Sequence, residues 1–155
     1  MEINETRDRI IDSMNSCKLS IQSGILPGGG VALLKSIQVL DLVHFDNHSQ
    51  SVAKDILVKV LKQPLIQLLR NASLEYDTIV HNIQNNQNVY YGYDLKNHQF
   101  GDLIEMGVID SFGTVKSILD DSFSVAGMVL TTEVIIYNDT AYSSTRLNKY
   151  QKKPF

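Results

Sequence analysis

The stretch GILPGGGVALLK, Gly24–Lys35, decides how the fold is read, because four glycines and a proline stand directly ahead of an apolar helical run. Either this loop only turns the chain, or its backbone comes close to something that a side chain would block. Backbone amides at the start of a helix are unpaired and partly positive, so they can hold a phosphate. The GxxxxGK[ST] pattern of a Walker A loop is absent, however, and the glycines taken alone favour a plain turn.

Apolar residues recur at helical spacing on both sides of this loop. Upstream, steps of four, three and four predict a helix over Thr6–Ser23 that ends at Gly24, with an apolar face made of Ile10, Met14, Cys17 and Ile21. Downstream, a second helix is expected from Val31, and its buried side would carry Leu33, Leu34, Ile37 and Leu40.

The middle of the chain predicts further helices. One covers Ser51–Leu61, and its inward face would be formed by Val52, Ile56, Val60 and Leu61. Pro64 would end or kink this helix, since proline lacks the amide donor, and it suits the start of a new helix over Leu65–Asn71. A shorter helical run is expected over Thr78–Ile83.

The remaining segments predict a hairpin, a long helix and a strand. VYYGYDLKNHQF is typical of a hairpin that turns through Lys96 and Asn97, with Asn97 in the left-handed conformation. Helical spacing then extends over Ser111–Thr131, and Glu133–Tyr137 favours a terminal strand. The predicted fold class is therefore mostly α, with a small β-hairpin and a terminal strand.

Composition fits one globular domain. The 155 residues allow a buried core, and 43% of them are hydrophobic. The net charge of -3 gives no nucleic-acid footprint, and no apolar stretch is long enough to cross a membrane. Cys17 is the only cysteine, which excludes an intrachain disulfide and favours a reducing compartment. Residues 138–155 are expected to form a separate basic, flexible tail, after a first part that spans residues 1–137.

Two acids are candidates for chemistry, and each has a plainer alternative. Asp12 lies off the apolar face of the first helix, where it is either a solvated acid or a carboxylate that polarises a water for attack on a phosphate. Asp110 either caps the long helix by accepting from amides of its first turn, or accepts from a sugar hydroxyl. His44 and His48 have no cysteine pair nearby, so no metal site is assigned.

Four segments, in this order, resemble the C-terminal part of a group I chaperonin, the GroEL type: GILPGGGVALL, KQPLIQLLRNA, YYGYDLKNHQFGDLIEMGVID and SVAGMVLTTE. The resemblance extends from Thr6 to Tyr137. It implies the second half of an equatorial domain, which is helical, holds ATP with Mg²⁺ and makes contacts within a homo-oligomeric ring. It further implies an ATP-dependent protein-folding chaperone that works with a co-chaperonin and binds unfolded proteins through a separate apical domain. Nucleic acid and membranes are not expected partners.

The resemblance also assigns site residues. Asp12 is carried over as the catalytic acid linked to hydrolysis. The positions expected to contact the nucleotide are Gly28, Gly29, Gly30, Asp94, Leu95, Lys96, Val108 and Asp110. Asp110 would bind the ribose and the Asp94 segment would lie near the base, while no metal ligand is assigned. The sequence departs from the family pattern at Leu95 and Lys96, which replace small residues, and at Ser111, which replaces a proline.

The family's upstream chain is absent from this sequence, including the other equatorial half with a DGTTT loop that binds phosphate and magnesium. We therefore expect exposed apolar helix faces, and ATPase activity in the complete subunit rather than in this chain by itself. The alternative is a non-catalytic helical module that binds protein partners, or a truncated gene product. The expected compartment is an organelle matrix, plastid-like or mitochondrial, or else the bacterial cytoplasm.

Overall fold

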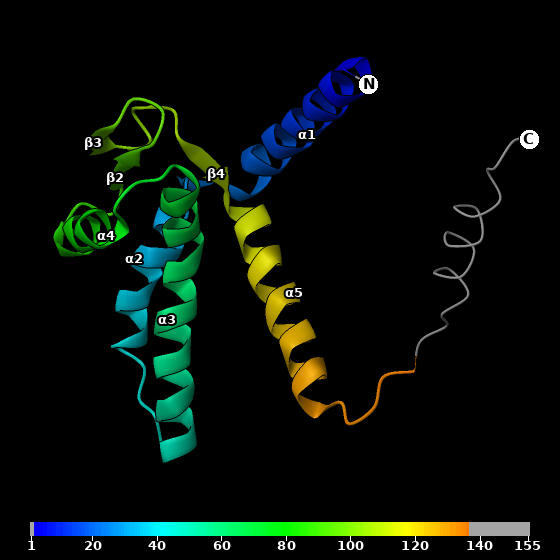
Figure 1. Cartoon of the computed structure of the whole chain (residues 1–155), viewed down its shortest axis with the longest axis vertical. Helices are drawn as coiled ribbons and strands as arrows, with labels where there is room; N and C mark the ends of the chain where they lie inside the picture. Colours follow the sequence, from blue (N-terminus) through cyan, green and yellow to red (C-terminus); the bar gives the residue numbers. More distant parts are fainter. Residues whose placement is uncertain (1, 137–155) are drawn as a thin grey trace, which may run out of the picture. The chain divides into compact units, whose positions relative to one another are not determined.

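The computed structural model describes residues 2–136, with side chains from residue 4 onward, and this part is mostly helical (Figure 1). The chain divides into two compact units, Met1–Ile118 and Leu119–Phe155, and each is described by itself. The elements follow one another as α1 (Glu2–Ser23), β1 (Ile25–Pro27), α2 (Val31–Leu40), α3 (His48–Asn71), α4 (Tyr76–Asn85), β2 (Tyr91–Asp94), β3 (Gln99–Asp102), β4 (Ile109–Ser111) and α5 (Phe112–Thr131).

The helix α1 leads directly into the glycine loop. It confirms the predicted first helix, although it begins earlier, and it ends at Ser23, where Gly24 has a φ of 92°. Glycine takes this left-handed conformation after a helix at little cost. The apolar face predicted from the spacing is exposed, with exposed fractions of 56% for Ile10 and 87% for Ile21. The expectation of uncovered apolar helix faces is thus met in α1.

A pair of short strands that the sequence did not predict joins distant parts of the first unit. β1 and β4 pair antiparallel, with Leu26 opposite Asp110 and Pro27 opposite Ile109. Each strand has only 3 residues, too few for a period of two to stand out in the sequence. This pairing fixes the glycine loop beside the segment GVID.

The core of the first unit lies among α2, α3 and α4, with α2 packed beside α3 (Figure 1). Its buried apolar side chains are Val31, Leu34, Ile37, Leu61, Leu65, Ile66, Leu69, Ile79, Val80, Ile83 and Leu103. The start of α2 at Val31 is as predicted, but Leu33 and Leu40 are only half-buried. The short helical run predicted over Thr78–Ile83 is confirmed as part of α4.

The prediction that Pro64 separates two helices is wrong, because α3 continues through it. Asn47 caps this helix by accepting a hydrogen bond from the Gln50 amide at 2.9 Å. A proline removes one hydrogen bond from a helix, and burial of side chains on both sides of it offsets that loss. The buried residues of α3 all lie in its second half: Leu61, Leu65, Ile66 and Leu69. Three residues that were expected to face inward are exposed instead, namely Val52, Ile56 and Val60.

The predicted hairpin is confirmed as β2 and β3, which pair antiparallel with Tyr91 opposite Asp102. The residue in the left-handed conformation is His98, with a φ of 53°, and not Asn97 as predicted. Asn97 has a different part in the turn, because its side-chain amide donates a hydrogen bond to the Asp94 carboxylate at 2.6 Å.

The helix α5 confirms the long helix predicted near the end of the chain. None of its residues is buried. Residues 133–136, expected to begin a terminal strand, form no strand, and Ile136 is 94% exposed. A strand forms only against a partner, and none of the described strands pairs with this segment. Tyr137 and the expected tail, residues 138–155, lie outside the described residues.

Candidate functional site

Two of the three consecutive glycines in the loop are required by the chain's own packing. The Gly28 amide donates to the Val108 carbonyl at 2.9 Å, and a Cβ on Gly28 would lie 3.1 Å from that carbonyl. Gly30 has a φ of 80°, and a Cβ there would lie 2.9 Å from the Leu65 backbone nitrogen. The close approach inferred from the sequence therefore occurs at both positions, with other segments of the same chain.

Gly29 is different, because the space beside it is open. Its φ is 65°, and a Cβ at this position would meet nothing within 4 Å. The helix that follows has no side-chain cap and no acid in its first turn. The Val31 amide donates to the Gly28 carbonyl at 3.2 Å, so it is the amides after it in the first turn that remain for another partner. This arrangement fits the approach of an anion such as a phosphate.

Asp110 lies in β4 directly beside the glycine loop, through the β1–β4 pairing. It does not cap α5, as the plainer alternative required. The Phe112 amide donates to the Gly24 carbonyl at 3.1 Å, and the Gly113 amide donates to Ser23 Oγ at 3.0 Å. Although Asp110 as a residue is exposed, neighbouring atoms desolvate its carboxyl group, which raises the pKa of Asp110 above its ordinary value.

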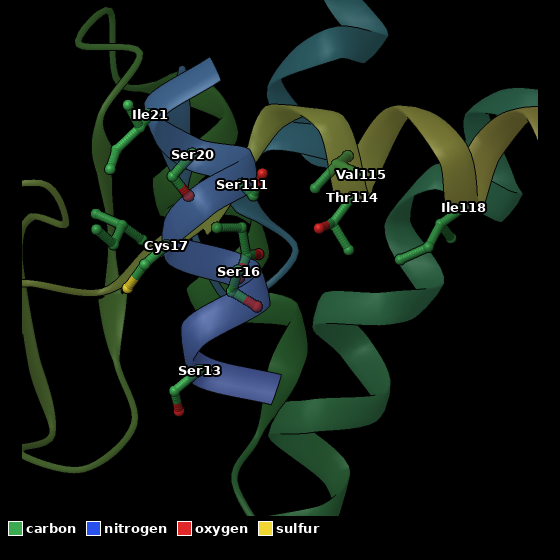
Figure 2. Close-up of a pocket in the computed structure, with 11 residues that line it drawn as sticks. Ser13, Ser16, Cys17, Ser20, Ile21, Ser111, Thr114, Val115 and Ile118 are labelled. Atoms are coloured by element: carbon green, nitrogen blue, oxygen red, sulfur yellow. The ribbon is translucent and has the colours of Figure 1, made fainter. Parts of the chain in front are cut away.

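A cleft of about 620 Å³ opens between α1, β4 and the first turns of α5 (Figure 2). Its lining includes Asp110 and hydroxyl groups from both helices, those of Ser13, Ser16, Ser20 and Thr114. Ser111 also lines the cleft, and its Oγ is the one buried side-chain polar atom of the described residues without a hydrogen-bond partner. Neither Asp12 nor Gly29 lines this cleft.

Asp12 is exposed on α1, next to Ser13 of the cleft lining. Its spacing places it on the same helix face as Leu19 and Ser23. That face meets the start of α5, because a Cβ on Gly113 would lie 2.8 Å from Leu19 Cγ. Asp12 lies on that face roughly 10 Å along the helix from Leu19, at 1.5 Å of rise per residue. The described residues do not bring Asp12 and Gly29 into one enclosed site.

The hairpin residues expected near a base have distinct environments. The Asp94 carboxylate is buried and accepts from the Lys96 amide at 2.8 Å and from the Asn97 side chain at 2.6 Å. These bonds, led by the one from Lys96, hold the pKa of Asp94 below its ordinary value. Asp94 therefore shapes the turn, whereas Leu95 is half-buried and Lys96 is exposed.

The hairpin packs directly on the first residue after the glycine loop. A Cβ on Gly92 would lie 2.4 Å from Leu103 Cδ1 and 3.1 Å from Val31 Cγ2. A side chain at Gly92 would press on Leu103 and, more weakly, on Val31 at the start of α2. The glycine loop, the GVID segment and the hairpin are therefore adjacent in the first unit.

Sequence reasoning missed Lys35, a buried lysine on α2. Its Nζ donates to the Ile83 carbonyl at 2.7 Å and to the Asn86 carbonyl at 2.6 Å. Burial lowers the pKa of Lys35 below its ordinary value. The signal was present in the sequence, because Lys35 lies four residues after Val31 and next to Leu34, on the buried stripe of the helix.

The described residues contain no group of three or more His, Cys, Asp or Glu side chains that could hold a metal ion. His44 Nε2 lies 4.0 Å from Asp46 Oδ1, and both side chains are exposed. Among the described helices, none combines the length and the apolar character that a bilayer crossing requires.

A sequence model of the TCP-1/cpn60 chaperonin family matches residues 1–140, and the chain therefore belongs to that family. It is similar to the mitochondrial chaperonin homolog Hsp-60 of Caenorhabditis elegans, with 37% identity over 136 residues, and to the chaperonin GroEL of Orientia tsutsugamushi (strain Boryong), with 36% identity over 136 residues. Each comparison covers 88% of this chain and 24% of the relative. The resemblance to a group I chaperonin is thus confirmed for a part of the length of these relatives.

Proposed function

We propose that the chain supplies one side of the ATP site of a group I chaperonin subunit. The observation that supports this most is the β1–β4 pairing, which places Asp110 opposite Leu26 and joins Gly28 to Val108 by a hydrogen bond. Through this pairing, a loop with one open glycine and a desolvated carboxylate become neighbours. An ATP molecule needs both kinds of group, an amide-rich turn for phosphates and an acceptor for ribose hydroxyls.

In this proposal, each site residue contacts one part of the nucleotide. Gly29 and the uncapped start of α2 approach the phosphates, and Asp110 accepts from a ribose hydroxyl. Val108, beside Gly28, and the hairpin turn at Leu95 and Lys96 border the base, with Asp94 keeping the turn in shape. ATP with Mg²⁺ supplies the phosphoanhydride bond that is cleaved.

Asp12 is proposed to orient the attacking water as a catalytic carboxylate. It is exposed on α1, where its carboxylate oxygens can accept a hydrogen bond from water. Orientation also requires groups that hold the phosphates and Mg²⁺ in line, and the described residues contain no group of three or more His, Cys, Asp or Glu side chains that could hold a metal ion. Hydrolysis is therefore proposed for the complete subunit.

The test supplies the upstream half of a bacterial relative as a separate chain and titrates ATP with Mg²⁺ by calorimetry. We expect saturable binding, and loss of hydrolysis with little change in binding in Asp12→Asn. Asp8→Asn is the matched control, since Asp8 is exposed one turn earlier on the same helix and should leave hydrolysis unchanged. Absence of binding, or normal hydrolysis by Asp12→Asn, would exclude the proposal.

At the level of the whole protein, the family and the named relatives support a chaperone that folds proteins in a homo-oligomeric ring, with unfolded polypeptides and a co-chaperonin as partners. The relatives include a mitochondrial and a bacterial protein. An organelle matrix or the bacterial cytoplasm is the compartment we propose on that basis.

A second candidate function is a non-catalytic module that binds protein partners through its exposed apolar helix faces. The observation in its favour is the extent of these faces, with Ile10 and Met14 on α1 and Phe123 and Met128 on α5 all more than half exposed. Light scattering and an ATPase assay of the chain alone separate the two. Robust turnover by a monodisperse chain would exclude the second candidate.

A further inference from the structure

Lys35 forms an unusual buried contact that ties two helices together. It is 7% exposed, and its ammonium group bonds two carbonyls, those of Ile83 and Asn86, at the C-terminal end of α4. No carboxylate takes part, because the ion pairs of the described residues do not include Lys35. The carbonyls at the end of a helix are unpaired and partly negative, so they are suited to receive a cation.

A continuous path of hydrogen bonds leads from this contact into the hairpin. The Asn86 side chain accepts from the Asn88 amide at 2.8 Å, and the Asn88 side chain accepts from the Tyr90 amide at 2.9 Å. The Asn88 carbonyl accepts from the Tyr91 amide at 3.2 Å, which is the first residue of β2. Residues 86–90, which connect α4 to the hairpin, are thus held by hydrogen bonds of their own asparagine side chains.

The other end of the contact lies close to the glycine loop. Lys35 is four residues after Val31, so both lie on one face of α2, one turn apart. Val31 follows Gly30 and packs under Gly92 of the hairpin. The hairpin is therefore joined to the helix that follows the glycine loop at two points, by packing at Val31 and by hydrogen bonds through Lys35.

We propose that Lys35, Asn86 and Asn88 form a latch that holds the hairpin at a fixed place relative to the glycine loop, and that Lys35 is a positioning residue for the base side of the nucleotide site. The conformational part of this proposal stands on the contacts alone. The part that concerns the nucleotide rests on the proposed ATP site. Lys35 itself donates to two backbone carbonyls and is not proposed as a phosphate ligand.

The first test measures amide hydrogen exchange in the 155-residue chain. Lys35→Met keeps the apolar stem and removes the charged donor, so we expect exchange over residues 88–103 to rise about tenfold, as expected when a buried charged hydrogen bond is lost. Exchange in the β1–β4 pair should change less than about twofold. Lys62→Met is the matched control, because Lys62 also reaches α4, at 3.4 Å from Gln84 Oε1, but is not buried.

Asn88→Ala tests the same path without disturbing a buried charge. It removes the acceptor for the Tyr90 amide and the donor to Asp102 Oδ2 at 3.4 Å, both on an exposed side chain, and should loosen residues 88–103 alone. If Lys35→Met does not fold, the exchange pattern of Asn88→Ala decides. Hairpin exchange unchanged in both variants, or raised equally in the β1–β4 pair, would overturn the latch. Restoration of protection by Lys35→Arg supports it, since arginine brings charged donors to the same carbonyls.

The second test compares two ligands in the chain reconstituted with the upstream half. Lys35→Met should weaken ATP binding about tenfold and change binding of inorganic tripolyphosphate less than about twofold, because only ATP needs the hairpin. An equal loss of affinity for ATP and for tripolyphosphate would mean that Lys35 has only a structural role, and would overturn the positioning role. If the wild-type complex binds neither ligand, the ATP site is refuted, while the exchange experiment still decides on the latch.

Discussion

The Gly113 amide donates a hydrogen bond to Ser23 Oγ at 3.0 Å, across 90 positions of sequence. The start of α5 is thus capped by a side chain at the end of α1. The same glycine leaves room for Leu19, which a Cβ would meet at 2.8 Å. Gly113 therefore contacts α1 in two ways, through the hydrogen bond to Ser23 and through packing against Leu19. The end of α1 and the start of α5 meet at this residue.

Removing this cap should weaken the contact between α1 and α5. Ser23→Ala leaves the Gly113 amide without an acceptor, and we expect the free energy of unfolding to fall by about 1 kcal/mol. Urea denaturation followed by circular dichroism measures the change. Ser13→Ala is the control, because Ser13 Oγ bonds only the Arg9 carbonyl of its own exposed helix surface. A Ser23 variant as stable as this control would contradict the capping role.

The glycine loop should tolerate substitution unequally. Gly30→Ala combines a left-handed backbone with a Cβ only 2.9 Å from the Leu65 nitrogen, and should cost about 2 to 4 kcal/mol. Gly29→Ala carries only the backbone strain, about 1 kcal/mol, because nothing lies near its added methyl group.

Ligand binding distinguishes the same two variants in the opposite way. Gly29→Ala should stay folded and lose ATP affinity in the reconstituted subunit, since its methyl group occupies the open space beside the loop. Thermal unfolding and calorimetry give the two readouts. Unchanged ATP affinity in a folded Gly29→Ala chain would remove Gly29 from the site.

The pH dependence of the free energy of unfolding should reveal the desolvation of the Asp110 carboxyl group. Its pKa in the folded chain is raised above the ordinary value of 3.8, so the folded state binds the proton more tightly than the unfolded state. The stabilising contribution is fully present below the unfolded pKa and is lost as pH rises through the folded pKa. At pH 7 the ionised carboxylate therefore destabilises the chain.

Asp110→Asn removes this effect. We expect the variant to be more stable than wild type at pH 7, and the difference to shrink as pH falls through the folded pKa of Asp110. Chemical denaturation at a series of pH values measures it. A variant less stable than wild type at neutral pH would show that the charge is satisfied by a contact other than those described.

Ser111 allows a test of the free-energy cost of a buried hydroxyl group without a hydrogen-bond partner. Its buried hydroxyl has no partner, so Ser111→Ala should leave stability unchanged or raise the free energy of unfolding by about 1 kcal/mol. Denaturant melts of the two chains suffice. A loss of stability would mean that the hydroxyl has a partner in solution, with a water in the cleft as its natural source.

The sequence predicted the elements whose signals are local and long. Helical spacing found α1, α2 and α5, and the turn expected through Lys96 and Asn97 found the hairpin. It failed at Pro64, where burial of Leu61 and Leu65 on either side outweighs the lost hydrogen bond. It also failed at residues 133–136, because strand propensity is realised only when a partner strand is present.

The candidate site was predictable only in part for the same reason. The glycines are visible in the sequence, but their separate causes are not, since Gly28 and Gly30 respond to Val108 and Leu65 from distant segments. The capping role first considered for Asp110 is wrong, because the Gly113 amide already donates to Ser23 Oγ, 90 positions earlier in the sequence. No local pattern reports such long-range contacts.

The β1–β4 pair also affects the order in which parts of the chain can fold during synthesis. During synthesis the loop with Gly28 emerges long before Val108, its hydrogen-bond partner. The core of α2, α3 and α4 can assemble from nearby segments in that interval, whereas closure of a distant strand pair is slow because of its entropic cost. During synthesis the helices of this core are therefore expected to form before the β1–β4 pair closes and fixes the glycine loop beside the GVID segment.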